Sequence, residues 1–118
     1  MQAYVDILRE GGVVACPTET LVGLLADALS PAAVNRVVEV KRRGPEPIAL
    51  ILPDLAALEQ VAARPGEAAL VLARRYWPGP LTLVVRALPG LPSALVRDGT
   101  LGVRVPGPSP ALDLARLF

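Results

Sequence analysis

Four short motifs stand at the ends of apolar segments along this chain of 118 residues. In order, they are Pro17-Thr18-Glu19-Thr20, Lys41-Arg42-Arg43, Trp77-Pro78-Gly79-Pro80-Leu81-Thr82 and Val103-Arg104-Val105-Pro106. The motifs put hydroxyl groups and cations where strands and helices end, and α/β proteins build anion-binding clefts at such ends. The set therefore predicts an α/β protein with an anion-binding cleft.

The segments between the motifs alternate between strand-like and helix-like patterns. Short apolar runs predict strands over residues 13–16, 48–52, 81–85 and 101–105. Helices are predicted over residues 2–10, 54–63 (capped by Asp54) and 66–76, and after the Ser-Pro pairs at 30–31 and 109–110, where serine caps and proline starts a helix. Trp77 is expected to have a structural role, in the core or in the cavity wall. This alternation predicts an α/β sandwich in one domain.

Composition excludes several classes of protein. The net charge of +1 gives no bulk attraction to nucleic acid or membrane, and no apolar run reaches the roughly 20 residues of a membrane span. No signal peptide is visible, and the lone Cys16 is expected to be a small buried residue in a reducing compartment, so we expect a cytoplasmic protein. The absence of histidine excludes nucleophile pairs that need a histidine base.

The motifs resemble those of the YrdC-like family of threonylcarbamoyl-AMP synthases. Members read Pro-Thr-Glu-Thr-Val-Tyr-Gly-Leu, Lys-x-Arg-Pro, Trp-Pro-Gly-Pro-Leu-Thr and Val-Arg-x-Pro, and the resemblance runs from Gly12 to about Ala115. It implies one YrdC-like domain over residues 1–118, with a twisted mixed β-sheet and flanking helices around an open cavity. It also implies a nucleotidyltransferase that makes threonylcarbamoyl-AMP and pyrophosphate from L-threonine, bicarbonate and ATP, for the formation of threonylcarbamoyladenosine in tRNA.

The C-terminal end departs from the family pattern. The family's Ser-x-Asn motif, which helps to hold the nucleotide, does not follow the last predicted helix. We therefore expect the C-terminal part of the family domain to be missing. The apolar side of that helix, Leu112, Ala115 and Phe118, is then expected to lie uncovered and to favour self-association.

The basic motif has two interpretations. Basic side chains at a helix C-terminus are favoured by the helix dipole alone. The functional alternative is binding of the ATP triphosphate, whose charge must be neutralised during attack at the α-phosphorus. Lys41 is the only lysine in the chain, which favours the functional interpretation. The resemblance assigns ATP binding and catalysis to Lys41 and Arg43, with Mg²⁺ held mainly by the phosphates and no side chain assigned to a metal.

The amino-acid site is predicted from the first and last motifs. By resemblance, Thr20 and Arg104 bind L-threonine and Thr100 contacts the nucleotide. Thr100 and Arg104 are four residues apart on one predicted strand and so share a face. Two alternatives remain open: an internal ion pair for Arg104, and local backbone bonds for the threonine hydroxyls. Glu19 is a polar neighbour that could contact a metal or an amine.

Two substitutions support a rival function. Val22 stands where the family has tyrosine, and Ile51 stands near a position where many members have histidine. Both weaken the predicted threonine pocket. The rival is a catalytically inactive YrdC-like module that binds a nucleotide or RNA. Binding of double-stranded RNA or tRNA and formation of a homodimer are left open, as is the activity of the chain itself.

Overall fold

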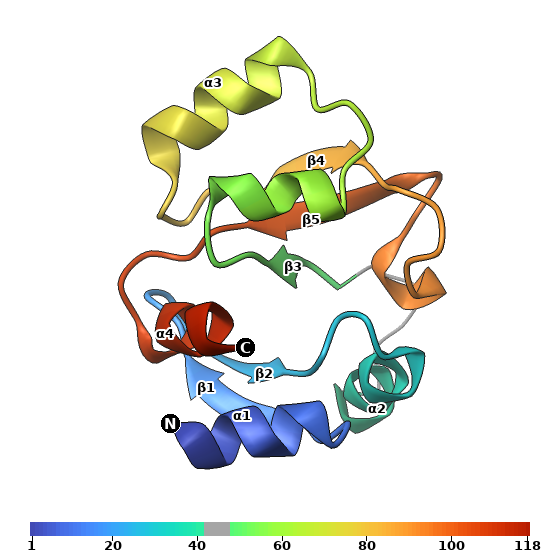
Figure 1. Cartoon of the computed structure of the whole chain (residues 1–118), viewed down its shortest axis with the longest axis vertical. Coiled ribbons are helices and arrows are strands. Elements are labelled where there is room, and N and C mark those ends of the chain that lie inside the picture. The colour runs from blue at the N-terminus through green and yellow to red at the C-terminus, as the bar shows by residue number, and fades with distance from the viewer. Residues whose placement is uncertain (42–47) are drawn as a thin grey trace.

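The computed structural model describes residues 1–41 and 48–118, without the side chain of Lys41. Its helices and strands alternate along the chain, so the predicted α/β class is confirmed (Figure 1). The helices are α1 (Gln2–Arg9), α2 (Pro31–Lys41), η1 (Leu55–Gln60), α3 (Glu67–Tyr76), η2 (Ser93–Leu95) and α4 (Pro110–Leu117), where η marks 3-10 helices. The strands are β1 (Val14–Pro17), β2 (Val22–Leu25), β3 (Leu50–Ile51), β4 (Leu83–Arg86) and β5 (Thr100–Arg104).

The strands of the described residues form two sheets. β1 and β2 make an antiparallel hairpin in which Val14 lies opposite Leu25. In the other sheet β5 is central, pairing in parallel with β3 and antiparallel with β4, so that Val103 lies opposite both Leu50 and Leu83. The mixed character expected of the fold is therefore carried by this three-stranded sheet.

Most of the helix starts and strands predicted from local sequence patterns are present in the structure. Ser109 Oγ accepts the backbone N–H of Leu112 at 3.3 Å, and Ser30 Oγ accepts that of Ala33 at 3.2 Å, as expected of N-caps. Asp54 also caps as predicted, but the segment after it forms a short 3-10 helix instead of the predicted α-helix. Strand β2 has no periodic signal in the sequence and forms because β1 supplies its hydrogen-bond partners.

Two apolar clusters stabilise the fold. The larger lies under the three-stranded sheet and includes Trp77, as predicted, and Leu112 from α4. The smaller lies between α1, β1 and α4 and includes Leu114 and the buried Cys16. Helix α4 therefore packs on both clusters and joins the two sheets (Figure 1).

The position of α4 corrects the expectation of an uncovered apolar helix side. Leu112 is only 3% exposed, because it packs against the three-stranded sheet. Exposed apolar surface is confined to the end of the helix, where Leu117 is 55% and Phe118 43% exposed. Within the described part of the chain, no helix has the length and apolarity needed to cross a membrane.

The three-stranded sheet has one covered face and one uncovered face. Leu101 and Val103 of β5 point into the larger cluster, whereas Thr100, Gly102 and Arg104 alternate with them on the opposite face. Val84 of β4 lies on this opposite face as well and is 71% exposed. This "open face" carries the predicted binding residues of β5, Thr100 and Arg104, both of which are partly buried.

Candidate functional site

The turn between β1 and β2 is held together by Thr18. Its hydroxyl accepts the backbone N–H groups of Thr20 at 3.1 Å and Leu21 at 3.0 Å. It also lies 2.7 Å from the carbonyl oxygen of Leu21, to which it donates. For Thr18 the structural interpretation is therefore correct, because its hydroxyl is occupied by the turn.

Thr20 differs from Thr18 because its hydroxyl has a single hydrogen-bond partner among the described residues. Thr20 Oγ1 lies 3.0 Å from Thr18 Oγ1, and the residue is exposed. The Thr18 proton goes to Leu21 and its two lone pairs accept the N–H groups of Thr20 and Leu21, so Thr18 does not use the lone pairs of the Thr20 hydroxyl. Thr20 can accept a hydrogen bond from a ligand.

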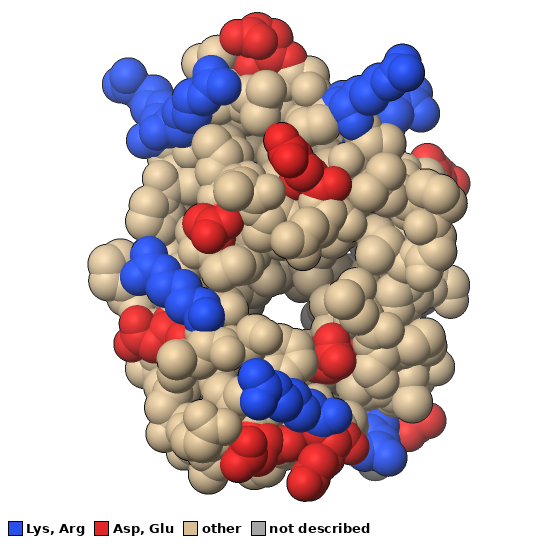
Figure 2. All heavy atoms as spheres, in the orientation of Figure 1, with Lys and Arg blue, Asp and Glu red and all other residues tan. Residues whose placement is uncertain are grey.

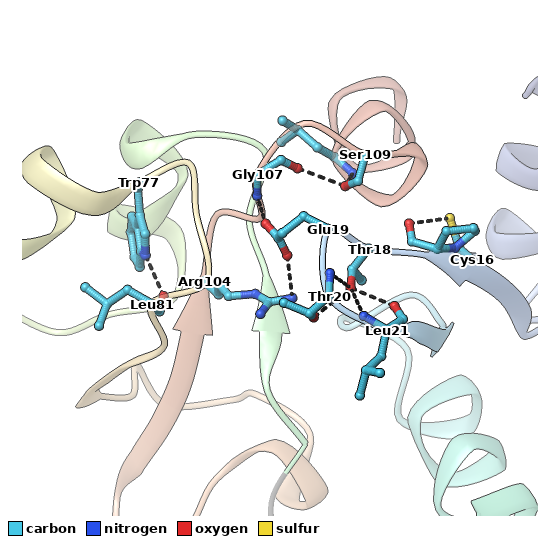
Figure 3. Close-up of polar contacts among 12 residues, drawn as sticks. Cys16, Thr18, Glu19, Thr20, Leu21, Trp77, Leu81, Arg104, Gly107 and Ser109 are labelled. Atoms are coloured by element: carbon cyan, nitrogen blue, oxygen red, sulfur yellow. Dashed lines mark hydrogen bonds and ion pairs between the residues drawn. The ribbon is translucent and has the colours of Figure 1, made fainter.

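Glu19 links this turn to the end of β5. Its Oε1 lies 3.2 Å from Nη2 of Arg104, and its Oε2 accepts the backbone N–H of Gly107 (Figure 3). Both charged side chains are only 17% exposed. Of the alternatives left open for Arg104, the structure contains the internal ion pair.

The ion pair brings two of the predicted site residues together. Thr20 directly follows Glu19 in the chain, and Glu19 contacts the guanidinium group of Arg104 (Figure 3). An arginine carries five N–H donors, and Glu19 is paired with one nitrogen only, Nη2. Within residues 1–41 and 48–118 no hydrogen bond uses the other donors, which leaves them to the carboxylate of a ligand, and arginine can hold a carboxylate through two parallel hydrogen bonds.

Thr100 lies at the other end of β5. Four residues along a strand span about 13 Å, so Thr100 is on the same face as Arg104 but does not join its cluster. Its hydroxyl donates to the carbonyl oxygen of Arg97 at 2.8 Å. A nucleotide would have to extend along the open face to reach both residues.

Gly102, between them, has a packing role in the sheet. A Cβ atom at this position would lie 3.3 Å from Cγ2 of Thr82 and 3.9 Å from Cβ of Ala49. The glycine therefore makes room for its neighbouring strands on the open face. A ligand that approached this backbone would have to share the space with Thr82.

The predicted triphosphate residues are only partly covered by the structure. Lys41 is the last residue of α2, but its side chain lies outside the described residues, as does all of Arg43. Their assignment to ATP remains a prediction from the sequence.

A hollow of about 370 Å³ lies between the two sheets. Its lining is mainly apolar and includes Leu25 of β2, Ile51 of β3 and Leu114 of α4, with Asp27 and Gln60 among the few polar residues. Figure 2 shows the face of the molecule hollowed at this place. Neither Thr20 nor Arg104 lines the hollow, so the polar site lies outside it.

The sequence analysis predicted the role of Trp77 but missed that of Gly107. Trp77 donates its indole N–H to the carbonyl oxygen of Leu81 at 2.8 Å, which confirms its structural role. Gly107 was not singled out, although the sequence Pro106-Gly107-Pro108 shortly after β5 marks a tight backbone path.

Burial raises the pKa of the Cys16 thiol above its ordinary value, as expected of an unreactive cysteine.

Sequence comparison gives a family match over nearly the whole chain. The model of the Sua5/YciO/YrdC family, described as "Telomere recombination", matches residues 6–118. Threonylcarbamoyl-AMP synthase from Pyrococcus abyssi is 41% identical over 112 residues, which are 93% of this chain and 33% of that protein. The Bacillus subtilis protein of the same name is 39% identical over 113 residues, with the same shares. The chain thus spans about a third of the length of these relatives.

Solved structures agree with this match. P. abyssi Sua5 complexed with L-threonine superposes with a TM-score of 0.93 at 39% identity, over 98% of this chain and 35% of that chain. E. coli YciO superposes with a TM-score of 0.82 at 24% identity, over 96% of this chain and 55% of that one, and so supports the fold alone.

Proposed function

Because the chain belongs to the Sua5/YciO/YrdC family, we propose that it functions in threonylcarbamoyl-AMP synthesis. The proposed reaction converts L-threonine, bicarbonate and ATP into threonylcarbamoyl-AMP, pyrophosphate and water. The observation that carries the proposal is the ion pair between Arg104 and Glu19, which brings the turn that holds Thr20 to the edge of the open face. The names of the relatives and the L-threonine complex of P. abyssi Sua5 support it.

The two site residues match the polar groups of an amino acid. The free N–H groups of Arg104 suit a carboxylate, and the free lone pairs of Thr20 suit a hydroxyl or ammonium donor. Glu19 does not compete for the ligand, because the Gly107 amide already holds one of its oxygens. A small polar ligand with one carboxylate therefore fits the proposed site.

The chemistry needs positioning more than a reactive side chain. The amine of L-threonine captures CO₂ as a carbamate, and a carbamate oxygen attacks the α-phosphorus while pyrophosphate leaves. No covalent enzyme intermediate forms, so the absence of histidine from the chain is no obstacle. Lys41 and Arg43 are proposed to neutralise the triphosphate.

In this proposed reaction Mg²⁺ would bind the ATP phosphates and neutralise part of their negative charge. Within residues 1–41 and 48–118, no three side chains of the metal-binding types gather at one point. The ATP oxygens are therefore the proposed main ligands of the ion, in keeping with the usual binding of Mg²⁺ through substrate phosphates.

Pyrophosphate release tests the proposal. Release that depends on both L-threonine and bicarbonate, and that is lost in Arg104→Ala, is the expected result. Arg74→Ala is the matched control, since Arg74 is an exposed arginine on α3, outside the proposed site. Binding of L-threonine or ATP in calorimetry without pyrophosphate release would instead favour the non-catalytic binding module.

A further inference from the structure

Glu19 lies in the β1–β2 turn, but its side chain makes none of the hydrogen bonds that hold the turn together. Thr18 closes the turn with its own hydroxyl, and Glu19 takes no part in those bonds. Its carboxylate instead reaches a backbone N–H that is 88 residues away in sequence. The formation of the turn therefore does not explain why a glutamate stands at this position.

Gly107 shows that the position of this carboxylate is built into the fold. A Cβ atom at residue 107 would lie 2.7 Å from Oε2 of Glu19, closer than van der Waals contact allows. The backbone of Gly107 is not in the left-handed region that favours glycine. A side chain at residue 107 would displace the end of Glu19, so the absence of a Cβ atom at Gly107 leaves room for the observed position of the carboxylate.

The carboxylate meets Arg104 on one nitrogen only. Oε1 lies 3.2 Å from Nη2, in a pair that is the one ion pair among the residues the structure describes. Oε1 is buried and receives no well-aligned hydrogen bond, so the attraction is mainly electrostatic. In a partly buried site such a pair is weakly screened by solvent and restricts the rotation of the guanidinium group.

From these contacts we infer that Glu19 is a positioning residue for Arg104. It fixes one edge of the guanidinium group, so that the other edge faces a ligand carboxylate. By joining the β1–β2 turn to the β5–α4 junction, it also sets the spacing between Thr20 and Arg104. The part of the inference that concerns a ligand rests on the proposed function.

The ligand test compares L-threonine with L-threonine amide, which lacks the carboxylate charge. Wild type should prefer L-threonine by about 10-fold or more, as expected of a charge-assisted pair. In Glu19→Gln the preference should fall below about 3-fold, with ATP affinity unchanged. Glu59→Gln makes the same charge change at an exposed position and should keep the wild-type preference. Equal weakening of both ligands would show a merely structural role and overturn the inference.

Gly107→Ala perturbs the same contact without changing any charge. The added methyl group displaces the end of the Glu19 side chain. It should lower the preference for L-threonine as Glu19→Gln does. An unchanged preference in Gly107→Ala would contradict the inference, because the carboxylate would then not need its observed position.

A measurement without ligand separates this inference from the proposed function. In nitrogen-15 NMR spectra, wild-type Arg104 should show separate Nη resonances, since the ion pair slows rotation about Cζ–Nε. In Glu19→Gln these resonances should merge. If they merge but wild type binds no L-threonine, the proposed function is wrong and the positioning of Arg104 by Glu19 stands. Identical Arg104 resonances in both proteins would overturn the positioning itself.

Discussion

Helix α4 packs against both apolar clusters, so we expect its buried side chains to stabilise both sheets. Leu112 lies in the cluster under the three-stranded sheet, while Leu114 lies in the cluster with α1 and β1. Leu112→Ala leaves a cavity between this helix and the sheet. Since Leu112 is 3% exposed, the change should destabilise the protein by about 2–5 kcal/mol, the range for fully buried leucines.

Leu117→Ala supplies a control in the same helix. Leu117 is 55% exposed, so its truncation should cost about 0.5 kcal/mol or less. Alanine and leucine have similar helix propensities, with alanine slightly better, so the difference between the two variants reports packing and not helix formation. A loss of about 3 kcal/mol is a large share of the roughly 5–15 kcal/mol that stabilises a domain.

Urea denaturation measures the effect with two probes. The fluorescence of Trp77, the only tryptophan, reports the larger cluster, and far-ultraviolet circular dichroism reports all helices. With a slope of about 1.5 kcal/mol per molar urea, Leu112→Ala should lower the midpoint by about 2 M. The two probes should coincide in wild type. Equal midpoints for Leu112→Ala and Leu117→Ala would refute the claim that the packing of α4 stabilises the sheets.

Three further predictions concern the site and Cys16. Arg104→Lys should raise the Kd for L-threonine about 10-fold, because lysine cannot form two parallel bonds to a carboxylate, and calorimetry that finds only ATP binding weakened would discard the assignment. Lys41→Ala and Arg43→Ala should each weaken ATP binding without changing the urea midpoint, and unchanged ATP affinity in both would remove them from the triphosphate site. Because burial raises the pKa of the Cys16 thiol, folding favours its neutral form, so this contribution to stability is present near neutral pH and is lost as the pH rises through the alkaline range. Cys16→Ala should therefore lose less stability than wild type between about pH 7 and pH 10, and parallel losses would show that the thiol is not involved.

Features set by near neighbours were predictable from the sequence. The caps of Ser30, Asp54 and Ser109 form as expected, because each side chain accepts an N–H three residues further along the chain. The alternation along β5 was predictable too, since successive residues of a strand point to opposite faces. For the same reason, the sequence alone placed Thr100 and Arg104 on one face of a strand.

Features set by distant parts of the chain required the tertiary structure. Glu19 meets Gly107, which is 88 residues away, and no local pattern specifies which polar groups share a partly buried place. The covered position of Leu112 likewise depends on a sheet formed by other segments. The sequence determined most of the elements, though not β2 or the 3-10 form of η1, together with the face of β5 and the candidate residues. The folded chain decided that the turn containing Thr20 reaches Arg104 through Glu19 while Thr100 stays apart, because only chain packing fixes distances between residues remote in sequence.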